Sequence, residues 1–146
     1  MAAISGRNIL SAVLVSSVIV SAYILAVDNY LWDANPINHH AFGLIAFMAV
    51  DVVLLIMLFV RQKMATMLAI GWGALQILLV VGDVAGGLGL PGFSSSDAYK
   101  YLILGNGNPS GLATDVLLVL NALIVVVSLP TYLKLRKETA APVVAT

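Results

Sequence analysis

The sequence contains no cysteine and very little charge. Its 146 residues include 7 Lys and Arg, 7 Asp and Glu and 2 His, which gives a formal net charge of +0. The absence of cysteine excludes disulfides, thiolate metal sites, iron–sulfur clusters and a cysteine nucleophile. The balanced charge excludes the broad basic field that binding to DNA or RNA requires, so no nucleic-acid partner is predicted.

Motifs of known catalytic chemistry are also missing. The sequence has no Walker loop, Rossmann glycine pattern, nucleophile elbow or zinc-protease motif. Its glycine-rich stretch, residues 82–89, ends an apolar run and follows no strand, which argues against a phosphate-binding loop. No reaction, catalytic residue or cofactor is predicted, and we expect the chain to have no catalytic activity of its own.

Apolar residues dominate what is present. Hydrophobic residues make up 61% of the chain and charged residues 10%, and the mean hydropathy is +1.04. A soluble domain of this size needs more charge on its surface. A helix needs roughly 20 apolar residues to cross a bilayer, and four stretches reach this length: about 8–27, 41–60, 64–88 and 112–133. Because these runs do not alternate with period two, they predict an all-α membrane protein, a single-domain antiparallel bundle of four transmembrane helices spanning 1–146.

The first stretch has an alternative interpretation as a cleaved signal peptide. Arg7 would supply its charged region, and Val20, Ser21 and Ala22 resemble a cleavage site. The apolar run is too long for a usual signal peptide, so a retained span is favoured.

Basic residues predict the orientation of the bundle. Most of them lie at the N-terminus, between spans two and three, and after span four: Arg7, Arg61, Lys63, Lys134, Arg136 and Lys137. Lys100 alone lies in a loop on the opposite side. By the positive-inside rule, both termini face the cytoplasm and the protein is multi-pass in the cell membrane.

The connections differ in length. Residues 28–40 form a first outer loop and residues 89–111 a longer second one. A typical helix start occurs in the second loop, at Ser94, Ser95, Ser96 and Asp97. It predicts a short helix over residues 97–104 that lies at the outer interface. Ser110 is predicted to cap span four. The tail, residues 138–146, is predicted to be loose.

A layer of polar residues is predicted near the centre of the membrane. Asp51 in span two, Gln76 in span three, Asn121 in span four and Ser17 in span one lie at similar depths. Polar residues are costly in lipid and therefore face protein or water. Two interpretations of Asp51 stay open: a proton or cation site, or a carboxylate that holds helices together by hydrogen bonds.

A second set of titratable residues is predicted nearer the outer face. It consists of acidic and histidine residues: Asp28, His39, His40, Asp83 and Asp115. Two neighbouring histidines cannot approach a haem from opposite sides, which excludes bis-histidine haem within this chain. A metal held by one histidine and these carboxylates stays as an alternative, although no metal site is predicted.

Small residues in span three predict close helix packing. They recur at spacings of four residues: Ala65, Ala69 and Gly73, and again Gly82 and Gly86. The ridge could pack inside the bundle or against a neighbouring protein. A second interpretation is a hinge or helix break around Asp83, which glycines surround.

Three functional hypotheses follow from these features. The favoured one is a small accessory subunit of a larger membrane complex of oxidase, monooxygenase or dehydrogenase type. Its partners would be lipid and other integral membrane subunits, with a hetero-oligomer favoured over a homo-oligomer. The alternative is a small homo-oligomeric proton- or cation-coupled transporter or channel that uses Asp51. The third is a redox component that binds a metal or a quinone.

Overall fold

Helices account for all the regular secondary structure in the residues that the computed structural model describes, 5–33, 38–87 and 109–140. They are α1 (Gly6–Val27), α2 (Tyr30–Asp33), α3 (Asn38–Val60), α4 (Gln62–Gly87) and α6 (Pro109–Ala140). Four of these helices are long and apolar enough to cross a membrane. This confirms the predicted all-α membrane fold, whereas the predicted interfacial helix at 97–104 lies outside the described residues.

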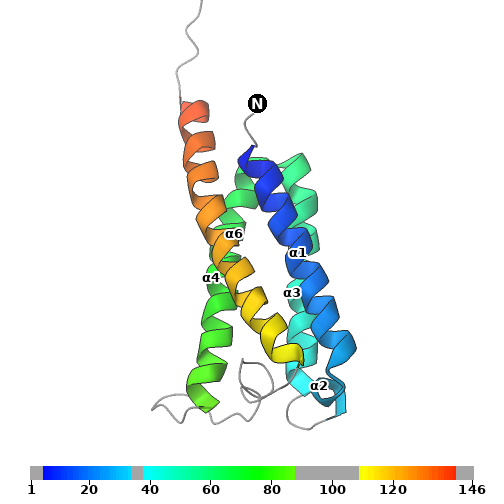
Figure 1. Cartoon of the computed structure of the whole chain (residues 1–146). Coiled ribbons are helices and arrows are strands. Elements are labelled where there is room, and N and C mark those ends of the chain that lie inside the picture. Colours follow the sequence, from blue (N-terminus) through cyan, green and yellow to red (C-terminus); the bar gives the residue numbers. More distant parts are fainter. Residues whose placement is uncertain (1–4, 34–37, 88–108, 141–146) are drawn as a thin grey trace, which may run out of the picture.

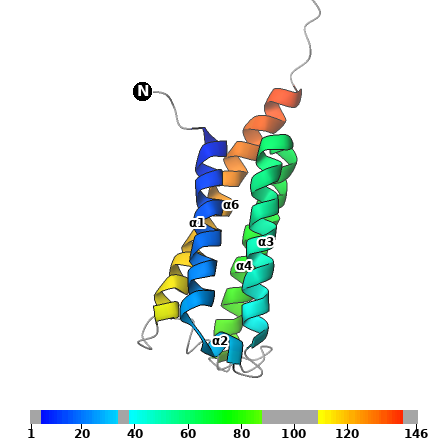
Figure 2. The same cartoon turned by 90° about the vertical axis from the view of Figure 1, so that its right-hand side faces the viewer.

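The four long helices form an antiparallel bundle (Figures 1 and 2). Each packs against two neighbours in the order α1, α3, α4 and α6, and α6 closes the ring against α1. The start of α1, the α3–α4 turn and the end of α6 lie at the same end of the bundle (Figure 1). We call this the basic end, because it carries Arg7, Arg61, Lys63, Lys134, Arg136 and Lys137.

The turn between α3 and α4 consists of a single residue. Arg61 lies between Val60, which ends α3, and Gln62, which begins α4. The Arg61 N–H donates to the Met57 carbonyl at 2.7 Å, and the Arg61 carbonyl accepts from the Ala65 N–H at 3.0 Å. Because Arg61 hydrogen-bonds to both helices, the chain reverses direction without a loop.

Two apolar layers fill the bundle at different heights. The layer nearer the basic end contains Leu10, Val13, Leu14, Leu54, Leu58, Ala65, Ala69 and Ile124. The layer nearer the opposite end contains Ile24, Leu31, Ala41, Leu44, Ala113 and Leu117. The buried residues Ser17, Asp51 and Gln76 lie between these layers along their helices. The core therefore has two mainly apolar layers with the Asp51 level between them, and buried polar side chains such as Thr66, Ser128, Ser21 and Thr114 lie among the apolar ones.

The C-terminal helix is longer than its apolar run. α6 continues through Pro130 to Ala140, so residues 138–140 of the predicted loose tail are helical. The Thr131 hydroxyl donates to the Val127 carbonyl at 2.7 Å beside the proline, and Lys134 lies 4.0 Å from Glu138 one turn later. The apolar run sets the length that fits in the membrane, whereas strong helix formers such as Leu, Lys, Arg and Glu extend the helix beyond it.

The small-residue ridge of α4 packs inside the bundle. Ala65 and Ala69 are almost completely buried. A Cβ atom added at Gly73 would lie 2.9 Å from Val125 Cγ2 and 3.0 Å from the Asn121 carbonyl oxygen, so the backbones of α4 and α6 approach closely there. Farther along, α4 stays helical through Gly82, Asp83 and Gly86 to Gly87. The hinge or helix break considered around Asp83 is therefore not present.

Replacing Gly73 by alanine should destabilise the bundle. The added methyl group would force α6 away from α4, and overpacking of this kind costs about 1–3 kcal/mol. Gly71→Ala is the matched control, because a Cβ atom at Gly71 meets nothing within 4 Å. Equilibrium unfolding in mild detergent should show a clear loss of stability for Gly73→Ala and none for Gly71→Ala. Equal behaviour of the two variants would contradict close packing at Gly73.

Candidate functional site

Asp51 is fully buried near the middle of α3, with 0% of its surface exposed. Its carboxylate accepts three hydrogen bonds from two neighbouring helices. Ser17 Oγ of α1 donates to Oδ2 at 2.6 Å, and Trp72 Nε1 of α4 donates to Oδ1 at 2.8 Å. Gln76 Nε2, also of α4, lies 3.3 Å from Oδ1. We call these four residues the Asp51 hub.

Helical spacing explains why the hub forms. Trp72 and Gln76 are four residues apart, so both side chains lie on the same face of α4 and reach the same oxygen. Ser17 lies on the buried face of α1 together with Ser21 and Asp28. Asp51 therefore joins α1, α3 and α4 through one side chain.

The hub needs no cation within the chain. No lysine, arginine or histidine lies in the middle of any of the four predicted spans. Three donors instead satisfy the carboxylate, and the indole of Trp72 can act as a donor alone. What this arrangement does chemically is to fix a buried acceptor and connect three helices.

Asn121 belongs to the predicted central layer but lies outside the hub. It is fully buried on α6. Its backbone lies close to Gly73 of α4, and Gln76 lies one turn farther along that helix. Neither of its side-chain amide atoms, nor Gln76 Oε1, has a hydrogen-bond partner among the described residues. The structure thus brings together Ser17, Asp51 and Gln76, and leaves Asn121 beside them without a direct bond.

Trp72 is the hub residue that the sequence did not reveal. Tryptophan in membrane proteins gathers at the two interfaces, whereas Trp72 lies deep within α4, on the same helix face as Gln76. That unusual depth is the signal that could have placed it in the polar layer. Its ring also packs edge-on against Phe47 of α3, with centroids 5.5 Å apart and planes at 86°.

Apolar layers enclose the hub on both sides along the bundle. Toward the basic end lie Leu14, Leu54 and Ile124, among others. Toward the opposite end lie residues such as Ile24 and Leu117. Buried polar side chains lie at these levels too, with Ser21 and Thr114 toward the opposite end and Thr66 and Ser128 toward the basic end.

Asp28 forms a second polar contact, one that ties α1 to α6. It is the C-cap residue that follows α1, is 4% exposed, and accepts a hydrogen bond from Ser110 Oγ at 2.6 Å. Ser110 was predicted to cap span four, but it lies inside the first turn of α6 and its hydroxyl bonds Asp28 instead. The partial positive charge at the start of a helix favours an anion there.

The other predicted outer residues share one end of the bundle, opposite the basic end. His39 and His40 lie in the first turn of α3, Asp83 near the end of α4 and Asp115 in the second turn of α6. His40 and Asp115 are partly exposed, and the side chains of His39 and Asp83 lie outside what the structure describes. Among the described residues, no three His, Asp or Glu side chains are grouped closely enough to hold a metal ion.

Comparisons with protein-family models, with curated proteins and with solved structures found no significant match. The fold and the hub define a class of protein, a membrane protein built as a four-helix bundle around a buried carboxylate.

Replacing Trp72 by phenylalanine should destabilise the protein. The change retains an aromatic ring beside Phe47 but removes one donor to a buried carboxylate, a loss of about 1–2 kcal/mol. Trp32→Phe is the matched control, because the Trp32 indole also donates one hydrogen bond, to the Leu25 carbonyl at 2.8 Å, at an exposed site. Unfolding in mild detergent should show the larger loss for Trp72→Phe.

A double-mutant cycle with Asp51→Leu isolates this hydrogen bond. If Trp72→Phe costs as much in the Asp51→Leu background as in the wild type, the indole does not stabilise the fold through Asp51.

Proposed function

We propose that the protein is a small accessory subunit of a larger integral membrane complex, of oxidase, monooxygenase or dehydrogenase type. In this role it packs against a catalytic subunit through the outer surface of its bundle. The observation that carries the proposal is the use of the polar side chains. Asp51 and Asp28 accept hydrogen bonds from the chain's own helices, which is a structural rather than a reactive arrangement.

The outer surface supports a role in contacts within the membrane. Large apolar side chains are exposed on every long helix, including Ile19, Phe42, Val53, Leu78 and Val126. Such a surface suits lipid and the apolar faces of other membrane proteins. A hetero-oligomeric assembly is favoured, since the described residues contain no group that suggests a reaction of their own.

The orientation is part of the same proposal. The basic end faces the cytoplasm of the cell membrane, so both termini are cytoplasmic. Its six basic residues are accompanied by one acidic residue, Glu138, whereas Asp28 and Asp115 lie toward the opposite end. This asymmetry is the one that positive-inside insertion produces.

The alternative function is a homo-oligomeric transporter or channel for protons or cations. A carboxylate at the centre of a membrane bundle favours it. Apolar layers lie on both sides of the hub, but the core between the hub and the end opposite the basic end also holds the buried polar residues Ser21, Thr114 and Asp28. A route between several copies of the chain would have to pass along its apolar outer surface.

Purification in gentle detergent from native membranes tests the accessory role. We expect the protein to co-purify in fixed stoichiometry with larger integral membrane subunits, one of which carries a redox or catalytic centre. Native mass measurement gives the composition. A lone chain, or a symmetric assembly of this chain alone, would contradict the proposal and favour transport.

Asp51→Asn then separates the two functions. Asparagine has the shape of aspartate, its oxygen can accept from Trp72 and Gln76, and its amide can donate to the Ser17 hydroxyl. We therefore expect the variant to fold and to assemble with its partners as the wild type does. A proton or cation flux in liposomes that the wild type supports and Asp51→Asn abolishes would overturn the accessory role.

Cysteine labelling tests the orientation. Because the chain has no cysteine of its own, single variants can be labelled with a maleimide that does not cross membranes. In intact cells, we expect Asn29→Cys to react and Lys137→Cys to react only after the membrane is opened. The reverse pattern would place the basic end outside the cell.

A further inference from the structure

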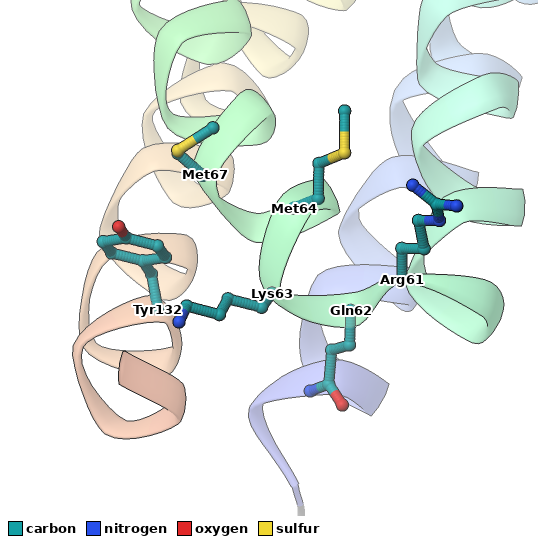
Figure 3. A pocket seen from close by; sticks show the side chains of 6 residues that line it. All are labelled: Arg61, Gln62, Lys63, Met64, Met67 and Tyr132. Carbon is teal, nitrogen blue, oxygen red and sulfur yellow. The ribbon is translucent and has the colours of Figure 1, made fainter. Parts of the chain in front are cut away.

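A surface hollow of about 480 Å³ lies at the basic end of the bundle, between the α3–α4 turn and α6. Its lining consists of Arg61, Gln62, Lys63, Met64, Met67 and Tyr132. We call it the α4–α6 hollow. Figure 3 shows Lys63 extending from the first turn of α4 toward Tyr132 of α6, with Met67 one turn deeper beside the same ring.

The lining changes from charged to apolar along the membrane normal. Arg61 and Lys63 lie at the very end of the bundle, where the chain turns from α3 into α4. Met67 lies four residues beyond Lys63 on α4, which places it about 6 Å deeper in the membrane at 1.5 Å per residue. Tyr132 lies in the same hollow, and tyrosine is typical of the interface between headgroups and hydrocarbon. The hollow thus has a cationic rim and an apolar floor.

We propose that the α4–α6 hollow binds one anionic phospholipid. Lys63, which extends toward Tyr132, contacts the headgroup phosphate, Arg61 adds its positive charge from the other side of Met64 (Figure 3), and the beginning of an acyl chain lies along Met64 and Met67. A flexible methionine side chain adapts to an irregular apolar ligand. A basic hollow between transmembrane helices at the headgroup level is the arrangement that binds acidic lipids.

The charge around the hollow supports an anionic rather than a zwitterionic lipid. Lys134, Arg136 and Lys137 lie on the part of α6 that follows Tyr132, at the same end of the bundle. Glu138 is the one acidic residue of the described chain at that end, and it lies 4.0 Å from Lys134. A zwitterionic headgroup would bring its own positive charge into this basic field, whereas an anionic headgroup balances it. This inference does not depend on the accessory role.

Retention of lipid by the purified protein tests the proposal. The probe is dioleoylphosphatidylglycerol, with dioleoylphosphatidylcholine as the neutral comparison, added to the full chain in mild detergent and read by native mass measurement. We expect one phosphatidylglycerol molecule to be retained in preference to phosphatidylcholine. In the double variant Arg61→Gln with Lys63→Gln, retention should fall about tenfold or more, since each basic residue near the surface contributes several-fold.

Two further variants separate a site from diffuse charge. Arg136→Gln with Lys137→Gln removes the same charge from the same end, but neither residue lines the hollow. This control should lose much less phosphatidylglycerol than the Arg61/Lys63 variant, because it weakens the surrounding charge but leaves the lining of the hollow intact. Met67→Trp fills the apolar floor without changing any charge, and it should lose the lipid. If the Arg61/Lys63 variant does not fold, Met67→Trp still tests whether the lipid binds in the hollow.

Several results would overturn the proposal. Equal retention of the two lipids would show that the hollow does not select an anionic headgroup. Equal loss in the two charge variants, or full retention in Met67→Trp, would show that the lipid is held by the general field of the basic end. Displacement of the lipid by millimolar glycerol 3-phosphate would mean that the hollow binds a soluble phosphate compound.

Discussion

The fold depends on one constraint, which is that a carboxyl group buried inside a membrane bundle must find its hydrogen-bond donors within the protein. Asp51 shows how the chain meets it, because a single carboxylate receives donors from α1 and α4. Three helices must therefore reach their final positions before this side chain is satisfied. Asp28 and Ser110 repeat the arrangement between α1 and α6. These two carboxylates connect α3 with α1 and α4, and the end of α1 with α6, whereas α4 and α6 meet by close packing at Gly73.

The four spans could be predicted because a bilayer demands long apolar runs, and nothing else in the sequence resembles them. Depth along each span also indicated that Ser17, Asp51 and Gln76 lie at one level. The rotation of each helix about its axis could not be predicted, and it decides that Asn121 lies outside the hub. Trp72 could not be predicted as a hub residue from hydropathy, because tryptophan is classed as a hydrophobic residue. Its indole N–H is nevertheless a hydrogen-bond donor. The last turns of α6 could not be predicted from hydropathy, because hydropathy marks only the part of a helix that fits in the membrane. Helix propensity, which hydropathy does not measure, extends α6 to Ala140.

The two ends of the bundle differ in chemistry as well as in charge. The basic end combines a one-residue turn, a cationic rim and an apolar floor within two turns of α4. The opposite end holds a buried carboxylate, partly exposed titratable residues and the short helix α2. One end is therefore suited to contact with the headgroups of the bilayer. At the other end, the hydrogen bond from Ser110 to Asp28 joins α6 to the end of α1.

The contact between the first and last long helices has a consequence for how the protein is made. α1 leaves the ribosome first, and α6, which supplies Ser110, leaves it last. Until α6 is inserted, Asp28 at the end of α1 lacks Ser110, the α6 residue that donates a hydrogen bond to it. Synthesis therefore passes through a stage in which the bundle is open along one side, and any factor that shields nascent membrane segments would act there. A chain truncated before α6 would stay at that stage.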